Sequence, residues 1–230
     1  MQLKVLEQGI KVEFKNEDLL REALTHRSYL NEHPEWKTPH NERLEFLGDA
    51  VLELAVTEEL YAQFPDLPEG QLTILRAALV NYQTLATVAA GLDLEDFILM
   101  SKGEKSDRSK AREAILANAI EAVIGAIYLD QGFEVSKNFI KKFVLVHLEE
   151  ILETRSYKDA KSELQEIVQE KQKLTPVYQV LQESGPAHSK TFTVGVYFGD
   201  YLAGQGSGSS KQEAETAAAR QALVKLMKKS

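Results

Sequence analysis

The chain has 230 residues, of which 43% are hydrophobic, with a net charge of −8 and no cysteine. The absence of cysteine excludes disulfides, thiolate zinc sites and cysteine nucleophiles, and it fits a reducing cytoplasm. No apolar stretch reaches the roughly 18 residues of a membrane span, and residues 1–4 lack the pattern of a signal peptide, so we expect a cytoplasmic protein without a membrane partner.

The charge is distributed unevenly along the chain. Residues 158–230 contain 10 Lys and Arg against 8 Asp and Glu, so this part carries +2 and the rest of the chain carries −10. An acidic front part and a mildly basic tail indicate two domains with different roles. The acidic part can still act on a polyanion if divalent cations neutralise some of its charge.

Helical periodicity dominates residues 1–153, and capping and breaking residues divide this part into separate helices. Asn16 is a candidate N-cap, and proline and glycine residues at 65–70 end a long acidic helix. The predicted helices cover residues 17–24, 41–64, 71–90, 111–130 and 134–152, and a polar loop is predicted at 101–108.

The periodicity changes near residue 158, where strand-like segments begin to alternate with turn residues. The predicted elements are helices at 160–172 and 210–228 and strands at 177–181, 191–197 and 201–204. We therefore predict two domains: an all-α domain over residues 1–153, a linker over 154–158, and an α-β-β-β-α domain of the α+β class over 159–230.

The acidic helix places three carboxylates on one face. Glu42 and Glu45 are three residues apart and Asp49 follows four residues later, so the side chains stack over adjacent turns of an otherwise apolar stretch. Gly48 in the helix interior costs about 1 kcal/mol relative to alanine. A bound divalent cation would compensate the repulsion between the acids, whereas the alternative interpretation is a solvated helix face.

A second acidic site lies in the helix predicted at 111–130. This helix is apolar on nearly all sides between residues 115 and 127, and a helix of that kind is buried. Asn118 and Glu121 are its polar exceptions, on one face. A buried Glu121 needs a metal, a raised pKa or a cationic partner, for which Arg43 and Arg76 are candidates.

If the two helices pack against each other, their polar residues converge. The site would then combine the oxygen atoms of Glu45, Asp49, Asn118 and Glu121. Mg²⁺ prefers such oxygen ligands, usually completed by waters and substrate phosphate.

The segment 41–50, NERLEFLGDA, is similar to the signature segment of bacterial ribonuclease III. The C-terminal part resembles a double-stranded RNA-binding domain. The resemblance covers nearly the whole chain in family order. Its further segments are 24–29 (LTHRSY), 68–70 (PEG), 121–130 (EAVIGAIYLD), 159–166 (DAKSELQE), 185–188 (GPAH) and 206–211 (GSGSSK).

The resemblance implies a Mg²⁺-dependent endoribonuclease, with Mn²⁺ as a possible substitute, that cleaves double-stranded RNA as a homodimer. Its substrates would be rRNA precursors and other structured RNAs, including mRNA and tRNA. Residues near Phe46 and Tyr61 are candidates for the dimer contact.

The same resemblance implies roles for particular residues of the nuclease domain. Glu45, Asp49, Asn118 and Glu121 would hold the metal, and Asp49 and Glu121 would be the catalytic carboxylates. Glu42 and Glu69 match supporting acids that line the cleft. All of these are expectations that the resemblance implies.

Position 118 departs from the family pattern, which usually has an aspartate there. Asn118 keeps the shape and a carbonyl oxygen but removes one negative charge, so we expect weaker Mg²⁺ affinity. This leaves open an alternative function, a cleavage-impaired protein that binds double-stranded RNA. An unrelated all-α metalloenzyme fused to an RNA-binding module is a third interpretation, and it requires the match at 41–50 to be chance.

The tail domain carries candidate RNA-binding residues. Gln165 and Glu166 on its first helix and His188 in the first inter-strand loop are expected in minor grooves, and Ser210 and Lys211 at the last helix start are expected to meet phosphate. The alternative for Gln165, Glu166 and Lys211 is a solvated surface, and for His188 a structural or solvated role. Gln212 stands where a second basic residue is frequent, which predicts weaker and less salt-sensitive binding.

Overall fold

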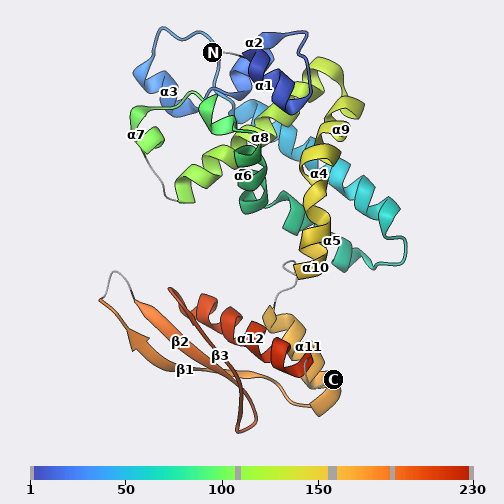
Figure 1. Ribbon diagram of the computed structural model, residues 1–230, viewed down its shortest axis with the longest axis vertical. Coiled ribbons are helices and arrows are strands. Elements are labelled where there is room, and N and C mark those ends of the chain that lie inside the picture. The colour runs from blue at the N-terminus through green and yellow to red at the C-terminus, as the bar shows by residue number, and fades with distance from the viewer. Residues whose placement is uncertain (1–2, 107–109, 155–159, 187–189, 228–230) are drawn as a thin grey trace. The chain divides into compact units, whose positions relative to one another are not determined.

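The computed structural model divides the chain into two compact units, Met1–Tyr157 and Lys158–Ser230 (Figure 1). It describes residues 3–106, 110–154, 160–186 and 190–227. The predicted linker at 154–158 lies outside the described residues except for Thr154, so it stays a prediction. Among the described residues, no helix is both long and apolar enough to cross a membrane.

The regular secondary structure in the described part of the first unit is helical, apart from one isolated β-bridge between Thr25 and Leu99. Its α-helices are α1 (Leu3–Ile10), α2 (Glu17–Ala23), α3 (Arg27–Glu32), α4 (Glu42–Gln63), α5 (Glu69–Val80), α6 (Tyr82–Gly91), α7 (Lys102–Ser106), α8 (Lys110–Gln131), α9 (Phe133–Phe143) and α10 (Leu148–Thr154). Two 3₁₀ turns, Leu94–Asp96 and Leu145–His147, connect some of them.

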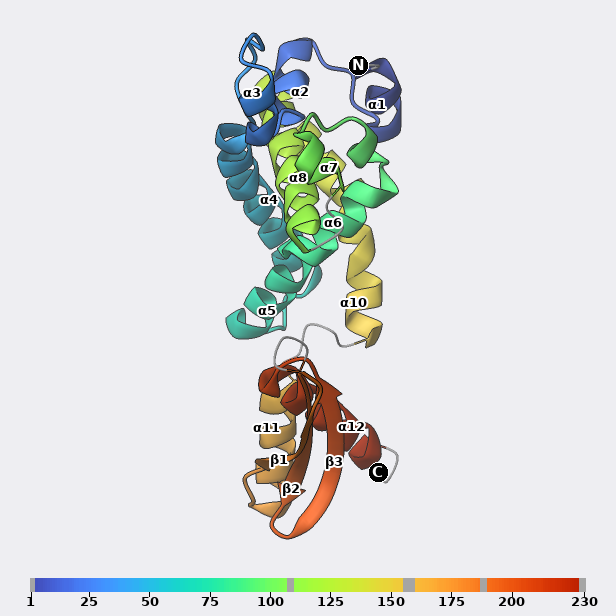
Figure 2. The ribbon, with the colours of Figure 1, turned by 90° about the vertical axis from the view of Figure 1, so that its left-hand side faces the viewer.

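Helix α8 forms the centre of this unit. The apolar residues between Ala119 and Ile127 are fully buried, as the prediction of an apolar surface on all sides requires. Helix α4 lies beside α8 in both views of the ribbon (Figures 1 and 2), and α2, α6 and α9 also pack on α8. The predicted helix at 17–24 also forms, because Asn16 accepts a hydrogen bond from the backbone N–H of Asp18 and caps α2.

The single helix predicted at 71–90 is wrong, because the chain breaks at Asn81 into α5 and α6. Asn81 has extended backbone angles, with ψ of 159°. Its side chain donates to the carbonyl of Ala78 at the end of α5 and accepts from the N–H of Thr84 at the start of α6. One amide side chain thereby satisfies both helix ends, so the break leaves few unpaired backbone groups.

The predictions at 134–152 and 101–108 are also wrong in detail. The first segment is interrupted after Phe143 by the 3₁₀ turn, whose tighter winding leaves Val146 exposed while Val144 and Leu148 are buried. The second contains α7 where we expected a loop. Helices α1 and α3 were not predicted.

The second unit has the order α11 (Ala160–Gln172), β1 (Val177–Ser184), β2 (Thr191–Phe198), β3 (Tyr201–Gly208) and α12 (Lys211–Met227). The strands form an antiparallel sheet in the order β1-β2-β3, and α11 and α12 pack on one face (Figure 1). Glycines in β3 let the alanine-rich α12 approach closely, since a methyl group on Gly206 would lie 2.2 Å from the nitrogen of Ala218. The predicted fold class, an all-α domain followed by an α+β domain, is confirmed.

Candidate active site

Helices α4 and α8 cross in backbone contact at two glycines. A methyl group on Gly48 would lie 1.7 Å from the carbonyl oxygen of Glu121, and one on Gly125 would lie 2.2 Å from the carbonyl oxygen of Leu44. No side chain larger than hydrogen fits at either position without moving the helices apart. The close approach explains why a glycine occupies the interior of each long helix despite its low helix propensity.

The crossing brings together the polar residues predicted on the two helices. Glu45 and Asp49 flank Gly48 on α4, and Asn118 and Glu121 lie on α8. The side chain of Asn118 donates a hydrogen bond to the carboxylate of Glu45. The negative charges of Asp49 and Glu45 act on Glu121. The structure therefore places all four residues in one cluster, which we call the crossing cluster.

Within the described part of the chain, the charges that act on Glu121 and raise the pKa of Glu45 are those of other carboxylates. Burial raises the pKa of Glu121 to about 7, and the nearby charges of Asp49 and Glu45 contribute to the rise. Burial also raises the pKa of Glu45, as do the charges of Glu42 and Asp49, whereas the hydrogen bond from Asn118 opposes the rise.

The arginines considered as partners of Glu121 have other neighbours. Arg76 donates to the hydroxyl of Thr57, and Arg43 acts on the carboxyl of Glu22. The groups that act on Glu121 are carboxylates. Among the described residues, the explanation for the buried acid that the structure supports is a raised pKa.

The crossing cluster supplies oxygen donors of the kind that hard cations bind. Within the described residues, however, no three acidic or histidine side chains are already arranged around a single point at which a metal ion could sit. Carboxylates without a cation repel one another, and the fourth donor is an amide. Holding a metal would therefore require rotation of these side chains about a fixed pair of helices.

The two predicted supporting acids lie outside the crossing cluster. Glu42 begins α4 and forms ion pairs with Arg27 at 3.1 Å and His40 at 3.8 Å. Glu69 begins α5 and accepts a hydrogen bond from the hydroxyl of Thr73 at 2.9 Å. Glu42 still acts electrostatically on Glu45, whereas Glu69 belongs to a helix that follows the far end of α4.

The predicted RNA-binding residues that the structure describes are exposed. Gln165 and Glu166 lie on one turn of α11. Ser210 accepts from the N–H of Glu213 and so caps α12, while Lys211 lies 3.6 Å from Glu183 and its ammonium sits 5.6 Å from the ring centre of Phe192. His188 lies outside the described residues.

A stripe of apolar side chains runs along the solvent-facing side of α4. Phe46, Leu54 and Tyr61 are 82%, 58% and 74% exposed, and Ala50 lies between the first two. The spacings of four, four and seven residues put all four on one helix face. We call this surface the α4 stripe. Only its two ends were expected from the sequence, although the spacing of Leu54 would have revealed the rest.

Sequence reasoning missed the roles of Gly125 and Asn41. Gly125 is the counterpart of Gly48, and its position on a fully buried helix face is the signal that would have identified it. Asn41 is only 2% exposed and donates to the carbonyl oxygen of Ala23. That contact joins positions 18 residues apart, so no local pattern indicates it.

Comparisons with known proteins support the assignment of the two units. Residues 16–148 match the family model described as ribonuclease-III-like, and residues 160–226 match the double-stranded RNA binding motif. A Ribonuclease 3 from Bacillus licheniformis is 45% identical over 227 residues, covering 99% of this chain and 91% of the relative. One from Desulforamulus reducens is 47% identical over 211 residues, covering 92% and 86%.

Solved structures agree with these relatives. The nuclease domain of ribonuclease III from Campylobacter jejuni is 46% identical with a TM-score of 0.58, and the match covers 63% of this chain and 97% of that one. That structure is described as showing flexibility in a region involved in dimer formation.

We predict that Gly48→Ala destabilises the first unit. The added methyl group meets the backbone of Glu121, so the helices must separate at a cost of about 1–3 kcal/mol or more. Thermal unfolding measures the loss. Gly9→Ala in α1 is the matched control because a methyl group there meets nothing within 4 Å and should not lower the melting temperature. Equal melting temperatures for Gly48→Ala and the parent would contradict a backbone contact at the crossing.

We predict that Glu121→Gln stabilises the metal-free protein much more at pH 8 than at pH 5. The pKa of Glu121 is raised to about 7, so the folded state binds more protons than the unfolded state between about pH 4.5 and 7. Its contribution to stability therefore decreases as the pH rises through this window, and glutamine removes that loss.

Melting temperatures at the two pH values, with a chelator present, provide the measurement. The gain at pH 8 should be about 2–5 °C. Glu113→Gln, at an exposed position of α8, should change the melting temperature little at either pH. A gain for Glu121→Gln that is the same at pH 5 and pH 8 would contradict the raised pKa.

Proposed function

Because the chain belongs to the ribonuclease III family and is a double-stranded RNA-specific endoribonuclease, we propose that it hydrolyses duplex RNA with Mg²⁺ at the crossing cluster. The observation that carries the proposal is the convergence of Glu45, Asp49 and Glu121 at the contact between α4 and α8, with the pKa of Glu121 raised to about 7. A site that holds excess negative charge favours a divalent cation.

The four residues of the crossing cluster would hold the cation. Carboxylate and amide oxygens suit Mg²⁺, and Mn²⁺ is a possible substitute with similar ligands. When bound, the metal supplies Lewis-acid stabilisation of the phosphoryl oxygens and an acidified water. Asp49 and Glu121 would be the catalytic carboxylates.

The chain's own residues would set the geometry for that chemistry. The amide of Asn118 would stabilise the ionised form of Glu45, since its hydrogen bond lowers the pKa of that carboxyl. Without a metal, Glu121 carries a proton part of the time near neutral pH because its pKa is about 7, and it would release that proton on binding a cation. Glu42 and Glu69 would line the cleft as supporting acids.

The second unit binds double-stranded RNA, and we assign the contact to its helices. Gln165 and Glu166 on α11 are exposed and can hydrogen-bond in the minor groove. Lys211 stands in the first turn of α12, where free backbone N–H groups and the helix dipole favour phosphate. Its ion pair with Glu183 is exposed and weak, so phosphate can displace it. Ser210 and His188 complete the proposed RNA-binding set.

The α4 stripe supports the proposal that the enzyme is a homodimer. Phe46, Leu54 and Tyr61 expose large apolar side chains on one helix face, and exposed apolar side chains grouped on one face can mark an interaction site. A second copy could place the same stripe against this one around a two-fold axis. We also propose rRNA precursors and structured mRNA and tRNA as substrates.

The alternative, a protein that binds duplex RNA without cleaving it, rests on Asn118 alone. Asn118 keeps a carbonyl oxygen for a hard cation, and Glu45, Asp49 and Glu121 remain in place beside it. Weaker metal binding is therefore the expected consequence rather than loss of the site.

Cleavage of an end-labelled RNA duplex across a Mg²⁺ titration tests the proposed function. The parent protein should cleave only with metal, and Asp49→Ala should lose about a thousandfold or more, since metal stabilisation of the transition state is worth several kcal/mol. Asn118→Asp restores a fourth carboxylate and should lower the half-saturating Mg²⁺ concentration by about tenfold.

The outcomes of this titration discriminate the two functions. Duplex binding without scission at any Mg²⁺ or Mn²⁺ concentration would establish the alternative. Scission by Asp49→Ala at the parent's rate would remove Asp49 from the catalytic set. An unchanged metal requirement in Asn118→Asp would show that residue 118 is not a ligand.

We predict that Leu54→Arg prevents dimerisation. Burying an unpaired guanidinium in an apolar contact costs several kcal/mol, so the dissociation constant should rise by about a hundredfold or more. Analytical ultracentrifugation of the full chain measures this, and Val5→Arg, at another exposed apolar residue, should have no effect. A Leu54→Arg dimer with the parent's affinity would place the contact away from the α4 stripe.

A further inference from the structure

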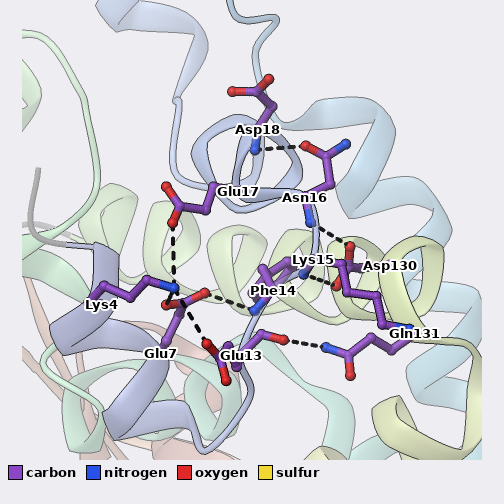
Figure 3. A network of polar contacts seen from close by, with 10 residues as sticks. All are labelled: Lys4, Glu7, Glu13, Phe14, Lys15, Asn16, Glu17, Asp18, Asp130 and Gln131. Atoms are coloured by element: carbon purple, nitrogen blue, oxygen red, sulfur yellow. Dashed lines mark hydrogen bonds and ion pairs between the residues drawn. The ribbon is translucent and has the colours of Figure 1, made fainter.

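A carboxylate at the C-terminal end of α8 holds the backbone that leads into α2. Asp130 accepts hydrogen bonds from two successive backbone N–H groups, those of Lys15 at 2.8 Å and Asn16 at 2.9 Å (Figure 3). Beside it, the side-chain amide of Gln131 donates to the carbonyl oxygen of Glu13 at 2.9 Å. The segment before α2 is therefore fixed to the helix that carries Asn118 and Glu121.

The segment before α2 is also held from its other side. Glu7 of α1, 4% exposed, accepts from the N–H of Phe14 at 2.8 Å and pairs with Lys4 at 3.0 Å (Figure 3). Asn16 then caps α2 through the N–H of Asp18. Because these contacts satisfy successive backbone groups, the start of α2 has little freedom to move along α8.

The end of α2 is fixed to the helix that carries Glu45. Asn41 lies just before α4, and its side-chain amide donates a hydrogen bond to the carbonyl oxygen of Ala23 at 3.2 Å. Its backbone N–H donates to the carbonyl oxygen of Thr25 at 2.9 Å. Its own carbonyl oxygen accepts from the N–H of Glu45 at 2.9 Å. Asn41 thus joins the end of α2 directly to the first turn of α4.

We propose that α2 is a brace between α8 and α4, and that Asp130 and Asn41 are positioning residues that keep the crossing cluster in register. The contact at Gly48 and Gly125 sets how closely the helices approach, but glycines present no side-chain ridge to resist sliding or rotation. The buried side chains on either side of the crossing hold the two helices together, and the brace adds a hydrogen-bonded connection that fixes Glu121 against Glu45.

Neither positioning residue reaches the reacting atoms. Asp130 lies nine residues beyond Glu121, about 13 Å along α8, and acts through α2. A displacement of about 1 Å in a catalytic constellation can cost a hundredfold in rate. The inference rests on the proposed function for the reaction that is positioned, while the brace itself can be observed without activity.

The test uses the full chain and the variant Asp130→Ala. We expect kcat for duplex cleavage to fall by about tenfold to a hundredfold while KM for RNA stays within about twofold, because the RNA contacts are separate from the brace. Mn²⁺ binding without RNA, measured by calorimetry, should weaken in parallel. Asp130→Asn keeps one acceptor oxygen and should give intermediate values of kcat and Mn²⁺ affinity.

A direct readout is the distance between α4 and α8. The chain has no cysteine, so spin labels can be placed at introduced cysteines replacing the exposed Glu53 and Glu113. Asp130→Ala should shift or broaden the distance distribution. Phe139→Leu, a buried substitution in α9 that also lowers stability, should leave both the distances and kcat unchanged.

The outcomes separate the brace from the proposed function. Parent-like distances and Mn²⁺ affinity in Asp130→Ala would overturn the brace, and so would an equal loss of kcat in Phe139→Leu. If the parent cleaves no RNA, the proposed function fails, and the distance distribution alone then decides for or against the brace.

Discussion

The backbone contact between α4 and α8 is the constraint on which the rest of the nuclease unit depends. Gly48 and Gly125 allow an approach that no other residue permits. The approach brings the carboxylates of Glu45 and Asp49 on α4 close enough to Glu121 on α8 to raise the pKa of Glu121. The buried surface of α8 offsets the helix propensity lost at the glycines and the repulsion between the acids, because the apolar residues around Glu121 are fully buried.

The sequence predicted the local parts of this arrangement and missed the non-local ones. The spacing of Glu45 and Asp49, and of Asn118 and Glu121, placed each pair on one face, and the all-apolar surroundings predicted that α8 is buried. The chain breaks at Asn81 because the side chain of Asn81 hydrogen-bonds backbone groups at the end of α5 and at the start of α6. These hydrogen bonds replace the ones that a continuous helix would form. Periodicity alone cannot decide between these outcomes.

The hydrogen bonds of Asp130 and Asn41 are even harder to predict from the sequence. Asp130 binds backbone groups more than a hundred residues away, and any residue except proline presents such an N–H group. Asn41 is similar, because its partners are carbonyl oxygens at the end of α2. Roles of this kind become visible only once the chain has folded. The outward face of α4 could have been found from its spacing, although periodicity does not separate an interface from a core.

Asn118 connects the stability of the fold to the chemistry of the site. An aspartate there would add another carboxylate to a cluster in which burial and nearby charges already raise the pKa of Glu45 and of Glu121. The amide instead donates to Glu45 and reduces that repulsion in the metal-free protein. A cation that binds only the folded state adds stability in proportion to the logarithm of its concentration over its dissociation constant. We therefore expect this chain to depend less on a metal to remain folded than an Asn118→Asp variant would, and the proposed Mg²⁺ would be held with one charge fewer.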